Sequence, residues 1–194
     1  GEAMLQTLVA ALIGVLIAFA IGALWGTANG TSRWFTAITQ PLLSALMAIP
    51  PVLLVALGVV WLGPRGSVVR LVVVLVALPL IVTAISEAVR DVDSDLVEMA
   101  RSFNLSRWAT ARHVVLPSVV SPVLAATSVT VGQALRVVVM AELLSGSNGV
   151  GAQVALARTN LQTADLFAWT IMLVVVVLVI EAAAIRPLTN YLLR

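Results

Sequence analysis

The sequence contains no cysteine and no lysine, and its only histidine is His113. Without cysteine the chain can form neither a disulfide bond nor a thiolate metal site, and it has no cysteine nucleophile. One histidine cannot assemble a metal cluster by itself, and a Gly-x-x-x-x-Gly-Lys phosphate loop cannot form without lysine. No nucleophile elbow or catalytic carboxylate pair is visible either. We therefore predict no catalytic residue, no metal site and no cofactor bound by this chain.

Charged residues are also scarce. They make up 10% of the 194 residues, whereas 61% are hydrophobic, and soluble domains typically contain about 25% charged residues. Such a chain has too few polar groups to cover its surface in water, which indicates that lipid is its solvent. The net charge is only +2 and the arginines are spread between apolar runs. Nucleic-acid binding, which needs a clustered basic face, is therefore not predicted.

Long apolar runs dominate what is present, and about 20 helical residues suffice to cross a hydrocarbon core. The pair Pro50-Pro51 must break or kink the second run, because proline lacks a backbone N–H. Ala141–Asp165 is too polar to cross lipid alone, so we expect a re-entrant or external loop beside the pore. The predicted fold class is all-α, a single transmembrane bundle over residues 1–194. Its five expected spans are Leu5–Trp25, Pro41–Leu62, Val68–Ile85, Val119–Val139 and Phe167–Ile185.

The positions of the arginines predict the orientation, because cytoplasmic loops carry an excess of basic residues. If the polar connector Thr27–Gln40 lies inside, Ser86–His113 and the C-terminal tail lie inside too, and the N-terminus lies outside. No basic region precedes the first apolar run, so Gly1–Met4 is not predicted to belong to a signal peptide. The inner segments then hold Arg33, Arg90, Arg101, Arg107, Arg112, Arg186 and Arg194, and the outer ones hold Arg65, Arg70 and Arg158.

The densest charge lies in one of these inner loops, residues 87–113. Asp93-Ser94-Asp95 is typical of a helix start, where carboxylates suit the positive end of the helix dipole. Asp95 and Glu98 also have the spacing of a capping box. A short helix is therefore predicted to begin here, outside the membrane.

The same loop is predicted to continue as a sharp turn and a second helix. Leu96, Ala100 and Phe103 fall on one face of the first helix. Asn104 is suited to the left-handed conformation that ends a helix, and Ser106 can cap the next helix. We expect the apolar face to dock on another protein, because a short cytoplasmic helix has little core of its own.

The spacing within this loop resembles a motif of binding-protein-dependent importer permeases. Their motif is Glu-Ala-Ala, three residues, Gly, nine residues, Ile, any residue, Leu-Pro. This chain has Glu98-Met99-Ala100, then Asn104, then Val114-Val115-Leu116-Pro117, with three identities changed and every spacing kept.

Two further stretches extend the resemblance. Ala48–Pro51 is similar to the Ile-Pro element of the family's second core helix. Ala141–Leu144, followed by Gly149–Gly151, is similar to the Ala-Glu…Gly-Leu-Gly stretch of a subgroup that imports aliphatic sulfonates, taurine, nitrate and related compounds. Those permeases usually have another transmembrane helix before the segment matched by Leu5–Trp25.

The resemblance implies a type I importer permease in the bacterial inner membrane. It implies as partners a second permease chain, identical or homologous, two ATP-binding subunits that bind ATP and Mg²⁺, and a periplasmic or lipid-anchored substrate-binding protein. The loop helix would dock on the ATPase and transmit its closure to two permease chains that alternate between inward-open and outward-open states. The implied coupling residues are Leu96, Glu98, Ala100, Arg101, Phe103, Asn104, Leu105, Leu116 and Pro117.

Arg136 stands inside the fourth expected span, with Gln133 one turn earlier. An intramembrane charge should face protein or water, so Arg136 either attracts an anionic substrate or pairs with Glu142 near the outer end. Glu181 in the last span is expected near the cytoplasmic interface. The candidates for the substrate path are Pro50, Gln133, Arg136 and Glu142.

The expected function is therefore that of a permease subunit, not an enzyme. Its substrate is expected to be a small organic or inorganic anion such as a sulfonate or nitrate, or another small solute. A membrane enzyme would need paired catalytic residues in the spans. A channel or an ion-coupled transporter predicts more intramembrane acids, and it leaves the charged loop unexplained. Copurification of an ATPase separates the importer from both.

Overall fold

The computed structural model describes residues 1–180 and 182, and within them every regular element is helical. The predictions for Glu181, Arg186 and Arg194 concern residues outside the described part of the chain. The elements are α1 (Glu2–Thr31), α2 (Arg33–Ala48), α3 (Pro51–Leu62), α4 (Gly66–Arg90), α5 (Ser94–Ser102), α6 (Arg107–Thr110), the π-helical segment η1 (Ala111–Val115), α7 (Leu116–Ser145), α8 (Val150–Thr159) and α9 (Thr163–Ile180).

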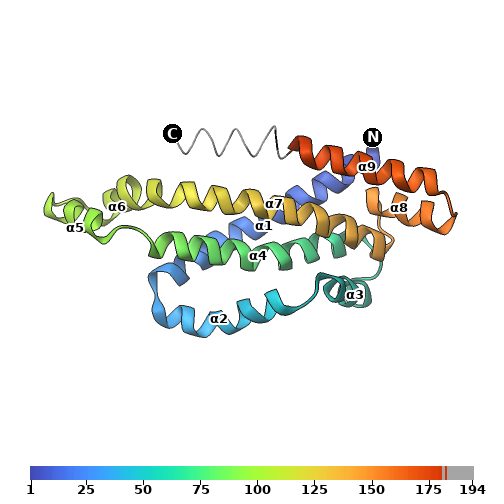
Figure 1. The fold of residues 1–194 in the computed structure, drawn as a ribbon. Helices are drawn as coiled ribbons and strands as arrows, with labels where there is room; N and C mark the ends of the chain where they lie inside the picture. The colour runs from blue at the N-terminus through green and yellow to red at the C-terminus, as the bar shows by residue number, and fades with distance from the viewer. Residues whose placement is uncertain (181, 183–194) are drawn as a thin grey trace.

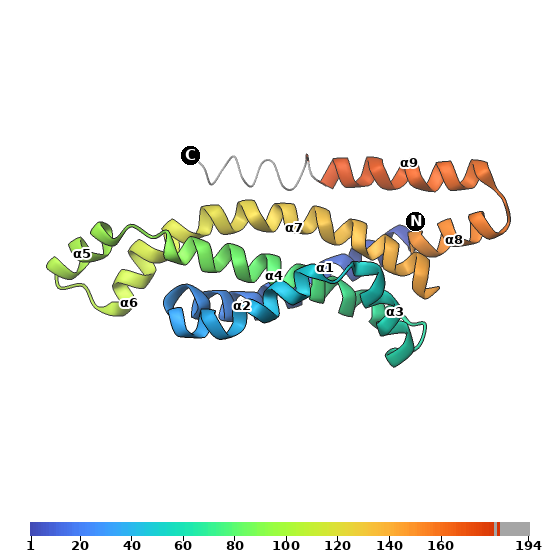
Figure 2. The same ribbon diagram turned by 60° about the horizontal axis from the view of Figure 1, so that its bottom comes forward.

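The long helices α1, α4 and α7 lie side by side, and α9 lies outside the bundle, near α8 and the end of α7 next to it (Figures 1 and 2). The short helices α5 and α6 project from one end of the bundle, whereas α8 and the N-terminus lie at the other end. By length and composition, four of the described helical stretches can cross a membrane, or five if α2 and α3 form one bent span. The predicted all-α bundle of about five spans is confirmed in this sense.

The predicted break at Pro50-Pro51 is present and sharp. The helices α2 and α3 meet there at an angle of 93°. Proline disfavours the helical conformation of the residue before it, and Ile49 and Pro50 both have extended ψ angles, 120° and 132°. Pro51 then occupies the first turn of α3, where its missing N–H is tolerated.

The predicted polar connector Thr27–Gln40 is helical except at one residue. Helix α1 continues to Thr31, and α2 begins at Arg33 after one extended residue, Ser32. Polar side chains fit inside these helices because their hydroxyls bond to their own backbone: Thr27 Oγ1 donates to the Ala23 carbonyl at 2.6 Å. Only Ser32 interrupts the helix, and its side chain caps α2 by accepting from the Phe35 N–H.

Close packing between α1 and α4 holds the bundle together. One face of α1 carries glycines that leave no space for a side chain. A Cβ added at Gly22 would lie 2.8 Å from Ile81 Cγ2, and one at Gly26 would lie 2.9 Å from the Val82 carbonyl oxygen. Small residues at a helix interface let backbones approach closely, as is common in membranes.

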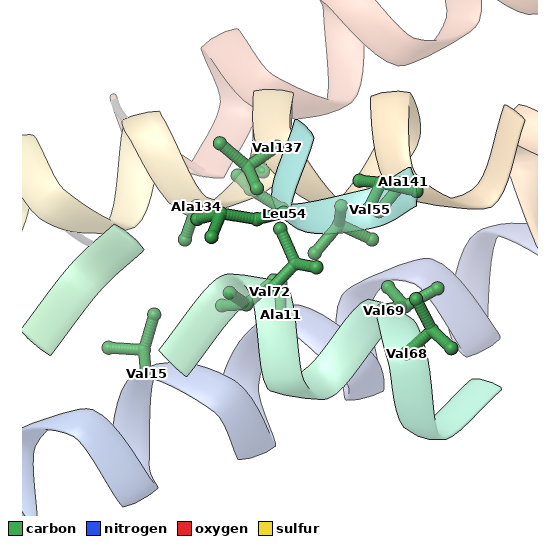
Figure 3. Packing of buried hydrophobic residues seen from close by; sticks show 13 residues of the cluster. Ala11, Val15, Leu54, Val55, Val68, Val69, Val72, Ala134, Val137 and Ala141 are labelled. Atoms are coloured by element: carbon green, nitrogen blue, oxygen red, sulfur yellow. The ribbon is translucent and has the colours of Figure 1, made fainter. Parts of the chain in front are cut away.

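The buried apolar residues form two clusters along the bundle. The cluster near the α8 end is shown in Figure 3, and it unites side chains from four helices. Helix α3 reaches this cluster because of the bend at Pro50, which turns it back toward α4 and α7. The members of this cluster that Figure 3 labels are Ala11, Val15, Leu54, Val55, Val68, Val69, Val72, Ala134, Val137 and Ala141.

Polar side chains join α1, α2 and α4 at the opposite end. Asn29 is buried, and its side-chain oxygen accepts from Thr39 Oγ1 at 2.8 Å. Arg90 Nη2 donates to the Asn29 carbonyl at 3.1 Å and to Thr36 Oγ1 at 2.6 Å. The α1–α2 turn and the charged loop after α4 therefore lie at the same end of the bundle, as the predicted topology requires.

Candidate functional site

Helix α5 begins where the sequence predicts, at Ser94. Its cap is Asp93, whose Oδ1 accepts from the Asp95 N–H at 2.8 Å. The predicted capping-box role of Asp95 and Glu98 is not what the structure uses, because Asp93 already occupies the cap position two residues before Asp95. The carboxylates of Asp95 and Glu98 are exposed instead, so they give the water-facing helix a charged flank.

Asn104 has the predicted left-handed conformation, with φ of 54°. The Asn104 N–H donates to the Arg101 carbonyl at 2.9 Å, and the Leu105 N–H donates to the Ala100 carbonyl at 3.1 Å. These two bonds define a Schellman motif, which satisfies the last carbonyls of a helix. Ser106 then caps α6 by accepting from the Ala109 N–H at 3.2 Å, as predicted.

The apolar face of α5 differs from the predicted one in one member. Ala100 is only 1% exposed, whereas Leu96, Met99 and Phe103 are 40%, 52% and 75% exposed. The interpretation of Ala100 as part of a docking surface is therefore wrong: α5 packs against α6 and η1, and Ala100 is covered within the chain itself. Sequence reasoning missed Met99, although its spacing of three residues after Leu96 places it on the same face.

The second loop helix runs without a break into α7. Between them, η1 contains the wider π turn, in which the Leu116 N–H donates to the Ala111 carbonyl five residues back. Pro117 follows, and its missing N–H favours such a local change of helix geometry. The other predicted coupling residues, Glu98, Arg101, Leu105, Leu116 and Pro117, are all exposed.

An exposed stripe runs along α7, and it holds two of the predicted path residues, Gln133 and Arg136. Both side chains are exposed, and they border a pocket of about 230 Å³ between α7 and α9. Pro50 is exposed too, but it lies at the α2–α3 bend and does not line this pocket. The structure therefore brings together two of the four candidates. The members of the stripe are Ser118, Pro122, Ala125, Val129, Gln133 and Arg136.

Glu142 does not pair with Arg136, so that alternative of the prediction is wrong. Six residues along an α-helix place two side chains about 120° apart around its axis. Arg136 therefore points outward, while Glu142 is 1% exposed and faces α1 and α8. This position also removes Glu142 from the exposed α7 stripe that holds the other candidates.

Glu142 instead holds three segments together. Thr7 Oγ1 lies 2.8 Å from Glu142 Oε2, the Gly151 N–H donates to the same oxygen at 3.0 Å, and the Val150 N–H donates to Thr7 Oγ1 at 2.9 Å. A Cβ at Gly149 would overlap the Glu142 carboxylate. This network, which we call the Glu142 latch, explains the Ala-Glu and Gly-Val-Gly stretches as one structural unit. Thr7 was missed because no local pattern links it to Glu142.

The chain is similar to known proteins of one transporter family. Residues 6–186 match the family described as binding-protein-dependent transport system inner membrane component. The chain is 31% identical over 132 residues to the aliphatic sulfonates transport permease protein SsuC of Escherichia coli (strain K12), covering 68% of this chain and 50% of that protein. It is 30% identical over 179 residues to the glycine betaine/carnitine transport permease protein GbuB of Listeria monocytogenes serotype 1/2a (strain 10403S), covering 92% and 63%. The chain thus spans about half to two thirds of the length of these relatives.

Solved structures show the same fold. An inward-facing MetNI methionine ABC transporter has a chain with a TM-score of 0.84 at 17% identity, covering 100% of this chain and 95% of that one. An amino acid ABC transporter crystallised with histidines has a TM-score of 0.67 at 15% identity, covering 93% and 92%. The match to a family of inner-membrane components and the apolar helices together indicate a multi-pass membrane protein. This chain belongs to the binding-protein-dependent transport system inner membrane components.

Proposed function

We propose that this chain is the membrane-spanning permease of an ATP-driven importer and that separate ATP-binding subunits bind and hydrolyse ATP with Mg²⁺. The observation that carries the proposal is the exposed face of α5. Leu96, Met99 and Phe103 present apolar surface on a short helix that projects beyond the bundle (Figures 1 and 2). Contiguous exposed apolar surface on a water-facing element marks an interaction site, and the family membership supports an ATPase as its partner.

The path from α5 to the membrane supports coupling by a rigid linkage. The Schellman turn at Asn104 fixes the angle between α5 and α6. From Arg107 to Ser145 the chain is continuously helical, through η1. A displacement of α5 would therefore move the same helix that carries Gln133 and Arg136 in the membrane, because a packed helix shifts as a unit.

The exposed stripe of α7 is the best candidate for the substrate path. A guanidinium and an amide inside a span are unfavourable in lipid, so this face is expected to meet water or a second permease chain. The substrate is a small solute delivered by a separate binding protein. The relatives' names differ in substrate, from aliphatic sulfonates and nitrate to riboflavin and glycine betaine. An anionic substrate is supported by Arg136.

The test compares Phe103→Ala with a matched control, Phe167→Ala, which removes an exposed aromatic at the far end of the molecule. The tagged chain is purified in mild detergent, and the ATP hydrolysis that copurifies is measured per permease chain. Truncating a central interface aromatic can cost about 2 kcal/mol, which corresponds to roughly a thirtyfold loss of association. Phe103→Ala should lose the activity, Phe167→Ala should keep it, and both should accumulate normally.

A second variant, Met99→Asp, tests the corrected face. It places a charge among the apolar side chains and should weaken association at least as strongly as Phe103→Ala. Copurified ATP hydrolysis that is unchanged in both variants, at normal permease levels, would show that α5 is not the coupling element. The absence of any copurifying ATPase from the unmodified chain would contradict the importer itself.

A further inference from the structure

The pocket between α7 and α9 lies near the middle of α7. Its walls are formed by residues 128–136 of α7 together with Val177 and Ile180 of α9. At 1.5 Å per residue, Gln133 is about 22 Å from Ser118 and about 18 Å from Ser145 along the helix. Ser118 lines a pocket with Asp91 at one end of α4, and Ser147, just beyond α7, lines one with Gly66 at the other end. The polar groups of the α7–α9 pocket are therefore far from both ends of the bundle.

A guanidinium at this depth needs a partner of opposite charge or water. Among residues 1–180 and 182, no carboxylate supplies one, since Glu142 is engaged in the latch and the remaining acids lie at the helix ends or in the loops. Helical side chains lean toward the helix N-terminus. Arg136 therefore leans toward Gln133 and into the pocket, rather than toward the nearer helix end.

From this placement we infer that Arg136 and Gln133 form a binding site for the oxyanion group of the transported solute, an inference that rests on the proposed function. The planar fork of a guanidinium matches the paired oxygens of sulfonate, nitrate, phosphate or carboxylate, and the amide of Gln133 adds a donor. Gly132 contributes no side chain, and Val177 and Ile180 give an apolar wall. A volume of about 230 Å³ suits one small anionic group rather than a large ligand, since whole-ligand pockets start at about 300 Å³.

The test uses the absence of cysteine from the chain. Val129→Cys places a single thiol on the exposed stripe, at the edge of the pocket and outside the proposed ligand groups. The full permease–ATPase complex in lipid nanodiscs is treated with an anionic thiol reagent, sulfonatoethyl methanethiosulfonate, or with its cationic trimethylammonium analogue. Labelling rates of the permease chain are read by intact mass. Thr163→Cys, an exposed position at the start of α9, is the control.

Both reagents should label position 129, the anionic one faster. Arg136→Gln should reduce the anionic-to-cationic rate ratio by about tenfold or more, because a nearby unit charge is weakly screened in such a site. Arg136→Lys should keep most of the ratio, and the ratio at position 163 should not change. Methanesulfonate or nitrate should slow labelling at position 129, whereas tetramethylammonium should not.

Four results would overturn the inference. Failure of both reagents to label position 129 would mean that this face is closed to water. An unchanged rate ratio in Arg136→Gln, or no protection by methanesulfonate and nitrate, would mean that no oxyanion binds there. An increase of the ratio in Glu181→Gln, which removes the acid that follows Ile180 in the sequence, would mean that this carboxylate neutralises Arg136. The proposed function is tested separately, because it would be contradicted if no ATPase associated with the permease. A complex that retains its ATPase but has an unreactive position 129 would therefore contradict only the anion site.

Discussion

Asn104 determines how α5 ends and where the chain turns toward α6. It ends α5 in the left-handed conformation and thereby turns the chain so that Leu96, Met99 and Phe103 stay exposed while Ala100 is covered. A comparable turn ends α8 at Leu161, with φ of 55°, where a bulky side chain accepts the same backbone conformation.

Asn104→Gly should couple as well as the original residue, because glycine adopts positive φ without steric cost. Asn104→Val should weaken the turn by about 1–2 kcal/mol, so that α5 loses its fixed angle. ATP hydrolysis that copurifies with the permease measures both. Ser102→Val, which adds the same side chain at an exposed helical position two residues earlier, should have little effect. Equal coupling by the Val and Gly variants at position 104 would contradict the assigned role of the turn.

Glu142 is buried, so its hydrogen bonds are expected to affect the stability of the fold. Glu142→Gln keeps the shape of the side chain but replaces one of its two oxygens, which accept from Thr7 Oγ1 and, at Oε2, from the Gly151 N–H, by an amide nitrogen that cannot accept. Leaving a buried donor unpaired costs about 1–3 kcal/mol. The thermal unfolding midpoint of the purified chain should fall, whereas Glu98→Gln, on the exposed flank of α5, should leave it unchanged. A midpoint for Glu142→Gln equal to that of the unmodified chain would show that the latch does not stabilise the fold.

At the scale of the helices, the contact between α1 and α4 depends on glycine rather than on large apolar side chains. Gly26 faces Ile85 and the Val82 carbonyl so closely that a methyl group has no room. Gly132 in α7 is also helical, yet nothing lies within 4 Å of an added Cβ. The two glycines therefore form a matched pair that separates the effect of packing from that of helix propensity.

Gly26→Ala should destabilise the protein by about 1–3 kcal/mol, because overpacking forces the two helices apart. Gly132→Ala should be neutral or stabilising by up to about 1 kcal/mol, since alanine favours the helix. Thermal unfolding in detergent measures both. A Gly26→Ala variant as stable as Gly132→Ala would mean that α1 and α4 can move apart without loss of stability.

At the scale of the whole molecule, the described chain is open on one side. None of the residues in α9 is buried, and the stripe on α7 remains uncovered. The described helices do not enclose a path around this stripe. Each chain also offers one projecting α5 face, which suits one ATP-binding subunit.

We therefore expect a complex of two permease chains, identical or homologous, and two ATP-binding subunits. Native mass measurement of the gently solubilised complex should give this composition. The Phe103→Ala complex should lose the mass of the ATP-binding subunits and retain the permease pair, since α5 lies at the end of the bundle. A monomeric permease that is stable and active in transport would contradict this expectation.

Much of this architecture follows from local chemistry. Apolar runs predict membrane helices, Pro50-Pro51 predicts the break, and Asn104 with Ser106 predicts the turn between the loop helices, because each depends on neighbouring residues only. Long-range contacts could not be predicted in the same way. Thr7 and Glu142 are 135 residues apart, and Ala100 is covered only because α5 folds back on α6 and η1. Which face of a helix is buried depends on the segments that pack against it, and only the tertiary structure brings those segments together.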